Sequence, residues 1–229
     1  RGGLMVTNAL RASTANTEAT MQVYAAETAV DRAPDSAARE RAIRNATDQL
    51  ARALDSLEAR EERARSRYVA GTRSAGDYLT VLGEVNVRAS RLQTLLLRLG
   101  ETADGQPAIQ DRLSDLQTRT LQHQGPLRDD LGAAVTGAGQ TDRLYVGASG
   151  QGVGLATMRE GTYVRGAVRT DARDEAVGGV DLDAAQDRIA DLYPWAWSNN
   201  AGVSIRSIGQ DVFRFQLSHG HGSLDSLLD

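Results

Sequence analysis

The sequence predicts an α+β protein in which an antiparallel bundle of three long helices precedes a small antiparallel sheet with one packed helix. From about residue 36 to residue 136, apolar residues recur every seven positions, as in helices that pack along a seam. After Thr136 glycines crowd a short stretch, and Val, Tyr and Phe then alternate with polar residues, as in strands. We therefore expect an N-terminal segment at 1–35, extended or helical, a bundle at 36–136 and an α+β module at 137–229.

Composition excludes several classes of function. A chain of 229 residues can bury a core without metal or disulfide links, and it has no cysteine for disulfides, thiolate metal sites or cysteine nucleophiles. It has no run of 18 apolar residues, so we expect no transmembrane segment in this chain. The net charge of -4 argues against nucleic-acid binding. All 26 basic residues are arginine, which a GC-rich genome or selection for guanidinium groups would explain.

The first helix is expected over residues 36–69. Asp35 or Ser36, after Pro34, can accept hydrogen bonds from free amides of the first turn, and Gly71 is a natural stop. Two heptad series make its seam: Ile43, Leu50, Leu57 and Ala64, and Thr47, Leu54, Glu61 and Tyr68.

Two more long helices should follow. The second begins at Ser74, which with Asp77 resembles a capping box, and we expect Gly100 to end it. A third helix follows the turn at 105–107, and Gly125-Pro126 should break it and leave a short helix over 126–135. Three apolar residues off the main seam of the second helix should cover the third helix or a partner: Val81, Val87 and Leu95.

The C-terminal part should hold five strands and one helix. The helix is expected from Asp181, as its N-cap, to Tyr193, before Pro194. The candidate strands are Leu144–Ala148, Val153–Met158, Thr162–Thr170, Val203–Ile208 and Val212–Ser218.

Two stretches of the chain carry a family resemblance. They are Thr7-Asn8-Ala9-Leu10 through Arg67-Tyr68 and Ser74-Ala75-Gly76-Asp77-Tyr78-Leu79, and the tail with Tyr163-Val164-Arg165, Leu192-Tyr193-Pro194-Trp195 and Ser218-His219-Gly220-His221-Gly222-Ser223-Leu224. This combination resembles uncharacterised exported proteins of halophilic archaea that are known only as domains of unknown function. The resemblance implies an extracellular or cell-surface location. The net charge is less acidic than expected of proteins from such organisms.

The tail alone is similar to PepSY-type modules, which are small extracytoplasmic binding or inhibitory domains. They place a strand, a helix that ends near Tyr-Pro and a hairpin in that order. The corresponding parts of this chain are Tyr163–Thr170, Asp181–Tyr193 and Val203–Ser218.

His219 and His221 are the clearest candidates for metal ligands. Residues two apart in a strand point to the same side, so both imidazoles could bind one ion, with Asp225 as a third ligand. The alternative is an exposed strand end flanked by glycines. His123 would join them only if the helices fold onto that strand end, and is otherwise a half-buried residue of the third helix's seam.

Trp195 and Trp197 stand out in a chain with 4% aromatic residues. Large aromatic residues dominate many interfaces, so the pair is a candidate partner-binding site. The alternative is that both fill the core where the helix returns to the sheet. In an extended segment the two rings would share a face.

Other motifs argue against catalysis. The glycines from 147 to 154 precede a predicted strand and not a helix, so we expect no nucleotide cofactor. The chain has no Gly-x-Ser-x-Gly elbow and no His-Glu-x-x-His motif. The adjacent acids Glu61-Glu62 and Asp129-Asp130 are expected to be solvated.

These observations favour a noncatalytic module, exported or on the cell surface, that acts through protein–protein contacts or self-association. We expect no cofactor and no nucleic acid, and anchoring through sequence outside these residues. The alternatives are a PepSY-like peptidase inhibitor or regulator, and a metal-dependent hydrolase that uses His219 and His221.

Overall fold

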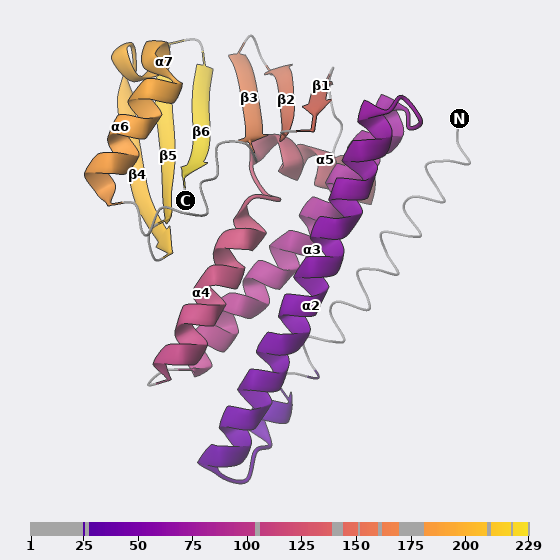
Figure 1. Cartoon of the computed structure of the whole chain (residues 1–229), viewed down its shortest axis with the longest axis vertical. Coiled ribbons are helices and arrows are strands. Elements are labelled where there is room, and N and C mark those ends of the chain that lie inside the picture. The colour runs from indigo at the N-terminus through magenta and orange to yellow at the C-terminus, as the bar shows by residue number, and fades with distance from the viewer. Residues whose placement is uncertain are drawn as a thin grey trace.

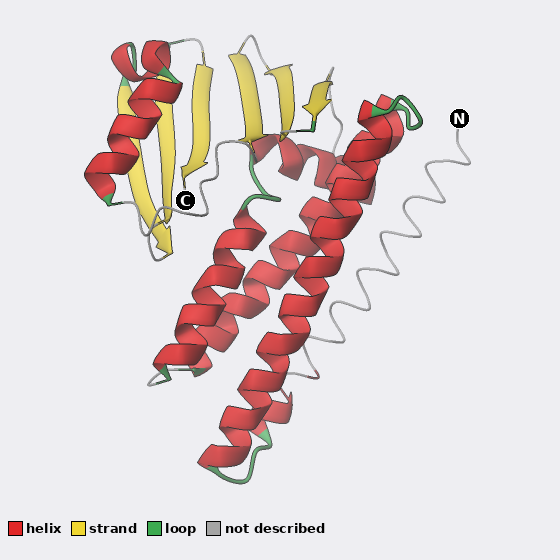
Figure 2. Cartoon of the chain, in the orientation of Figure 1, coloured by secondary structure: helices red, strands yellow, loops and turns green. Residues whose placement is uncertain are grey.

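A bundle of helices lies against one face of a mixed sheet (Figure 1). The structure is a computed structural model that describes residues 25, 28–103, 106–138, 144–150, 152–159, 162–169, 181–209, 212–220 and 222–228. Figure 2 shows the helical part below the strands, with further helices beside one end of the sheet. The predicted α+β class is confirmed. Within the described ranges, no helix has the length and apolar character needed to span a bilayer.

The first two helices of the bundle begin at the predicted caps. Helix α2, Ser36–Val69, starts after Asp35, whose Oδ1 accepts a hydrogen bond from the Ala38 amide at 2.6 Å. Helix α3, Ala75–Thr102, starts after Ser74, whose Oγ accepts from the Asp77 amide at 3.1 Å. Each side chain satisfies an amide that has no partner within the helix.

Gly71 follows the end of α2 as predicted, but Gly100 does not end α3. Gly71 adopts a φ of 71°, the left-handed conformation that terminates a helix. Gly100 remains helical, and the helix continues until the Ala103 amide donates to the Leu99 carbonyl at 2.8 Å. The prediction of a stop at Gly100 was therefore wrong, because glycine ends a helix only where the chain turns left-handed.

Two shorter helices complete the bundle. Helix α4 spans Pro107–Leu121 and α5 spans Pro126–Thr136, with the break at Gly125-Pro126 where the proline predicted it. Helix α3 contacts α2, α4 and α5, so it is the central helix. The off-seam residues Val81 and Leu95 are buried inside this bundle.

The contact between α3 and α5 is unusually close. A β-carbon at Gly83 would lie 2.7 Å from the Leu131 carbonyl oxygen, and one at Gly132 would lie 2.5 Å from Oδ1 of Asn86. Two glycines that face the opposite helix therefore set how near the two helices lie.

The six strands of the described part of the chain form one sheet in the order β1-β2-β3-β6-β5-β4. Their bounds are Leu144–Ser149, Gly152–Arg159, Thr162–Arg169, Gly202–Gly209, Val212–His219 and Gly222–Leu228 for β1 to β6. All neighbours are antiparallel except β3 and β6, which are parallel with Val164 opposite Ser223. The parallel pair and β6 itself depart from the predicted five-stranded antiparallel sheet.

Two helices accompany the second half of the sheet. Helix α6, Leu182–Leu192, begins after the predicted cap Asp181, which accepts a hydrogen bond from the Ala184 amide at 2.8 Å. Helix α7, Pro194–Ser198, was not predicted, and it contains both tryptophans.

The two halves of the sheet are covered on opposite faces. In β1–β3, buried Val153 and Leu155 belong to the same core as the bundle. In β4–β6, Phe215 and Leu217 pack with Ala185 and Ile189 of α6 in a separate core.

The strand register shows that these two cores lie on different sides. Arg165 of β3 lies opposite Leu224 of β6, which in turn lies opposite Leu217 of β5. Paired residues share a face. Arg165 therefore points to the side that α6 and α7 cover, away from the bundle.

Candidate functional site

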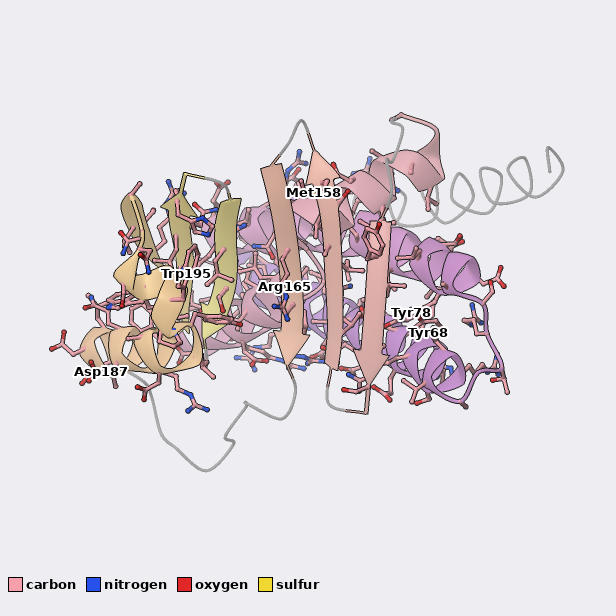
Figure 3. All side chains as sticks on the ribbon, turned by 90° about the horizontal axis from the view of Figure 1, so that it is seen from above. Tyr68, Tyr78, Met158, Arg165, Asp187 and Trp195 are labelled. Carbon is pink, nitrogen blue, oxygen red and sulfur yellow. The ribbon has the colours of Figure 1, made fainter. Side chains whose placement is uncertain are left out.

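The outer face of β1–β3 is a shallow surface that no described helix covers. Figure 3 looks onto this face, with Met158 and Arg165 on it and Trp195 beside it. Tyr145 is 64% exposed and Met158 is 52% exposed, which is high for large apolar side chains in a sheet. We call this surface the outer face and define it by Tyr145, Gly147, Gly154, Ala156, Met158, Arg165 and Ala167.

Arg165 gives the outer face a positive charge. Its side chain is exposed, and it forms no ion pair with any residue that the structure describes. Its neighbour across the β2–β3 pair is Ala156, and the next residue on the same face of β3 is Ala167. On the other side of Arg165 lies Leu224 of β6. The guanidinium therefore has short side chains on its β2 side and a leucine on its β6 side, and its exposed fork of donors is accessible to a carboxylate.

The structure separates the roles of the two tryptophans. In the short helix α7, residues two apart do not share a face, unlike residues of an extended segment. Trp195 is 63% exposed, and its ring meets the His219 ring edge-on with centroids 5.0 Å apart. Trp197 packs against the core of Phe215 and Leu217. Trp195 is thus exposed on the surface, and Trp197 is partly buried against the core.

The predicted metal site is described only in part. His219 is the last residue of β5 and is half-buried against Trp195. His221 and the side chain of Asp225 lie outside the described residues. Within the described part of the chain, no group of three His, Cys, Asp or Glu residues could hold a metal ion. Binding of metal by His219 and His221 stays a prediction.

His123 does not lie with His219; it belongs to a buried polar cluster under the sheet. Its Nδ1 lies 2.7 Å from Oε2 of Glu61 on α2. Arg128 of α5 donates to both carboxylate oxygens of Glu61, at 2.6 and 3.0 Å, and is itself 4% exposed. This is the two-pronged pairing that favours arginine over lysine.

The cluster keeps the Glu61 carboxylate ionised. Burial alone would raise the pKa of Glu61, but the charge of Arg128 and the hydrogen bonds from His123 and Arg128 hold that pKa well below its usual 4.5. Nearby, burial and then the charge of Glu61 raise the pKa of Tyr78 to about 12.

A row of further ion pairs joins α2 to α4. Arg119 binds Glu58 through Nε at 3.1 Å and Nη2 at 2.7 Å, and the same Nη2 reaches Asp55 at 2.6 Å. Hydrogen bonds to Glu58 raise the pKa of Arg119 despite partial burial. Arg112 pairs with Asp48 at 2.7 Å, one heptad earlier on both helices.

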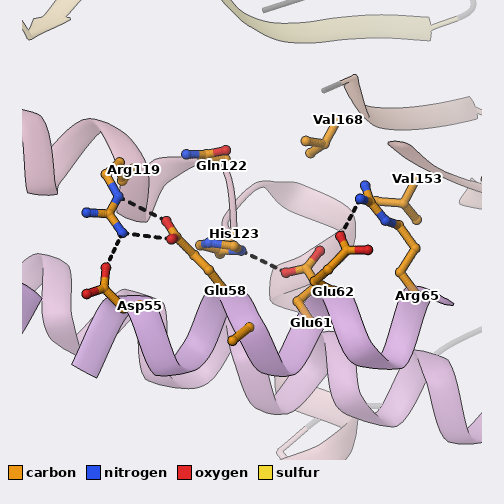
Figure 4. A pocket seen from close by; sticks show the side chains of 11 residues that line it. Asp55, Glu58, Glu61, Glu62, Arg65, Arg119, Gln122, His123, Val153 and Val168 are labelled. Carbon is orange, nitrogen blue, oxygen red and sulfur yellow. Dashed lines mark hydrogen bonds and ion pairs between the residues drawn. The ribbon is translucent and has the colours of Figure 1, made fainter. Parts of the chain in front are cut away.

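A cavity of about 520 Å³ lies between α2, the end of α4 and the inner face of β2 and β3 (Figure 4). Acidic and basic side chains of the helices line one side, and Val153 and Val168 of the sheet line the other. The residues that line the cavity are Asp55, Glu58, Ala59, Glu61, Glu62, Arg65, Arg119, Gln122, His123, Val153 and Val168.

Sequence reasoning found one part of this cluster and missed the rest. His123 is 7% exposed, more buried than the half-buried seam residue expected. The expectation that Glu61 is solvated was wrong, because its side chain is 13% exposed and clamped by Arg128. Its neighbour Glu62, at 54% exposure, is on the surface as predicted. The available signal was a carboxylate at a seam position of α2 and a histidine at a seam position further along the chain.

Comparison with known proteins agrees with the expected domains of unknown function. Residues 144–229 match a family of unknown function (DUF7094), and residues 5–140 match a domain of unknown function (DUF7096). No curated protein and no solved structure matches the chain. An archaeal source, export and likeness to PepSY modules stay predictions. The match to the DUF7096 domain covers more than half of the residues of the chain, so the chain belongs to the DUF7096 family.

Proposed function

We propose that the protein is a noncatalytic binding module that holds an acidic segment of a partner protein on the outer face. The observation that carries the proposal is the exposed Arg165 on a sheet face that no described element covers. Tyr145 and Trp195 provide large aromatic surfaces on the same side. Aromatic and arginine side chains are enriched at interface hot spots.

Charge and shape both support an extended acidic partner. Ala156 and Ala167 leave a shallow floor on the β2 side of Arg165, and Leu224 and then α7 with Trp195 lie on its other side (Figure 3). An extended segment can lie on such a floor and place a carboxylate against the guanidinium. The strand β1 is an edge of the sheet, so the segment could also pair with its backbone.

Photocrosslinking in the native cells tests this proposal. A photoreactive phenylalanine analogue replaces Tyr145 or Trp195, and Leu97 on α3 serves as the control site because it is 51% exposed and belongs to the bundle. The expected result is a crosslink from Tyr145 on the outer face and from Trp195 beside it to one protein, at a segment rich in Asp and Glu. Arg165→Glu should abolish these crosslinks without changing the folded state.

Two outcomes would contradict the proposal. Crosslinks from Leu97 to the same protein, or crosslinks that survive Arg165→Glu, would show that the outer face is not the binding surface. Turnover of a substrate by the purified chain would show that the protein is not merely a binding module.

The proposal includes a location outside the cell, supported by the family resemblance. Protease added to intact native cells should degrade the protein if it is exported or on the surface. A peptidase inhibitor or regulator is a narrower form of the same proposal, in which the acidic segment belongs to a peptidase. Inhibition that is lost in Trp195→Ala would support that form.

The metal-dependent hydrolase remains the rival function. Elemental analysis of protein purified without chelator distinguishes it from a binding module. One metal ion per chain that is lost on His219→Ala would support the rival.

A further inference from the structure

We propose that a second copy of the chain covers the outer face when no acidic partner is bound, with α6 and α7 of each copy lying on β1–β3 of the other. The inference rests on the proposed function, because it concerns how access to the same surface is regulated. Three observations carry it: the position of the exposed apolar side chains, a step in the surface that is complementary to its own copy, and opposite charges on the two sides of that step.

Exposed apolar side chains gather on the side of the sheet that faces away from the bundle. Seven large apolar side chains of the described residues are exposed, and two of them belong to α2 and α3. Leu182 begins α6, and Val203 of β4 is paired with Leu217, which packs against α6. The five exposed apolar residues on this side are therefore Tyr145, Met158, Leu182, Trp195 and Val203. Such a concentration on one side is typical of a surface that binds another protein.

The same side of the sheet has a step that is complementary to its own copy. Helices α6 and α7 stand on β4–β6 as a ridge, and no described helix covers β1–β3 beside them (Figure 1). A two-fold axis along the boundary of β3 and β6 would place the ridge of each copy on the outer face of the other, so that every contact occurs twice.

The ridge also fits the outer face in size. The 11 residues of α6 make a helix roughly 16 Å long. The 8 residues of β2 and the 8 of β3 make a surface roughly 26 Å long. Helix α6 of a second copy can therefore lie within the length of the outer face.

Opposite charges lie on the ridge and on the outer face. Asp183, Asp187 and Asp191 recur every four residues of α6 and are exposed, so they lie on one side of the helix. None of the three forms an ion pair with a residue that the structure describes. Arg165 is the exposed positive charge of the outer face. In the two-fold arrangement, each Arg165 meets the acidic side of α6 from the other copy.

The second copy and an acidic partner would compete for one surface. Both would place carboxylates against the guanidinium of Arg165, and a two-pronged contact occupies it with one carboxylate. The dimer would also cover Tyr145 and Trp195, which the proposed function assigns to the partner. Dimer formation therefore closes the outer face, and an acidic partner has to displace the second copy.

The mass of the full chain in solution tests the dimer. Sedimentation equilibrium over a range of concentrations should give a monomer–dimer equilibrium for the unchanged protein. Arg165→Glu should raise the dissociation constant by about tenfold or more, because the contact occurs twice per dimer. The double variant Asp187→Lys with Asp191→Lys should have the same effect. Asp111→Lys with Asp115→Lys changes two exposed acids four residues apart on α4, so it is the matched control and should dimerise normally.

Mixing the two variants shows which surfaces meet. Arg165→Glu alone places like charges at both contacts of a dimer, and so does Asp187→Lys with Asp191→Lys alone. In a mixed dimer the new carboxylate faces the new ammonium groups, and the unchanged Arg165 faces the unchanged acids. The mixture should therefore recover the dimer that each variant alone has lost.

Photocrosslinking of the purified protein tests the competition. A photoreactive analogue at Tyr145, in a mixture of light and heavy isotope-labelled chains, should crosslink to α6 or α7 of another copy. Hexaglutamate, as a probe for an acidic segment, should lower the yield of this crosslink by about twofold or more. Sodium glutamate at the same concentration of carboxylate is the control and should leave the yield unchanged.

The outcomes separate this inference from the proposed function. A chain that stays monomeric, or mixed variants that do not recover the dimer, would overturn the inference and leave capture of an acidic partner in cells standing. Crosslinks between copies that hexaglutamate does not reduce would overturn the competition. A dimer of the expected kind without any acidic partner captured in cells would support the self-contact and overturn the proposed function instead.

Discussion

The two halves of the sheet bury their apolar residues against different helices. Strands β1–β3 lie on a bundle with a large core and buried ion pairs, while β4–β6 depend on two short helices and a small core around Phe215. Because the covers lie on opposite faces, each half leaves one face without its own helices. The face of the sheet that is packed by helices changes at the parallel pair of β3 and β6. One continuous sheet can therefore be anchored by the bundle and still present the outer face.

Removing the centre of the smaller core should have the largest effect. Phe215→Ala deletes a fully buried ring and should cost about 3–5 kcal/mol of unfolding free energy. Since the two cores are separate, hydrogen exchange should show lost protection in β4–β6 and α6, with α3 still protected.

Phe213→Ala is the matched control, because Phe213 is only half-buried at the edge of the same core. It should cost less than Phe215→Ala. Equal loss of protection in α3 would contradict the comparison, because it would mean that both halves unfold as one unit.

The bundle side should be sensitive to acid through Glu61. Its pKa is lower in the folded protein than the usual 4.5, so its stabilising contribution is complete above that pH. The contribution is lost as the pH falls below 4.5 toward the lower folded pKa, because the folded state must then accept a proton on Glu61.

Glu61→Gln should remove this part of the acid dependence and leave Arg128 buried without its countercharge, at a cost of about 3 kcal/mol at neutral pH. Chemical denaturation as a function of pH measures both effects. Glu62→Gln is the control, since Glu62 is largely exposed and should change stability little. A pH profile of Glu61→Gln that matches the unchanged protein would contradict the assignment.

The close contact between α3 and α5 offers a smaller perturbation under β2 and β3. Gly83→Ala would place a methyl group 2.7 Å from the Leu131 carbonyl oxygen, so the helices must separate, at a cost of about 1–3 kcal/mol. In the same helix, Gly76→Ala has only Ser74 Oγ at 4.0 Å and should be neutral or stabilising. Thermal unfolding of the two variants measures the difference, and equal midpoints would mean that the contact is not tight.

Sequence reasoning located the helices because their signals are local. Asp35, Ser74 and Asp181 cap helices through their own side chains, and the bounds of α2 agree with the prediction to the residue. Strand β6 was missed because Gly222–Leu228 contains no β-branched or aromatic residue. Its position comes from pairing with β5 and β3, which is a property of the whole sheet.

The candidate sites, too, were predictable only where the signal lies in neighbouring residues and not where it depends on contacts between distant ones. The sequence singled out Trp195 and Trp197 by their rarity, but only helix α7 leaves one exposed and packs the other, partly buried, against the core. Glu61 and Arg128 are 67 residues apart, so no local pattern joins them. The heptad spacing of α2 placed Glu61, a polar residue, at a seam position that is normally apolar. It did not indicate which residue pairs with Glu61.

The smallest expected change in stability comes from Trp195, which is compared with Trp197 in the same short helix. Trp195→Ala should change the unfolding free energy by no more than about 0.5 kcal/mol, because the ring is 63% exposed and contacts only the edge of His219 in the described aromatic pairs. Trp197→Ala should cost about 1–3 kcal/mol, since it leaves space beside Phe215 and Leu217. Urea denaturation of both variants, together with the crosslinking yield, gives the decisive pair of measurements. If Trp195→Ala removes partner capture while the unfolding free energy is unchanged, the side of the sheet that includes the outer face binds the partner. If Trp195→Ala destabilises the fold as much as Trp197→Ala does, Trp195 is a structural residue. The outer face would then have no exposed tryptophan beside it for a partner to contact.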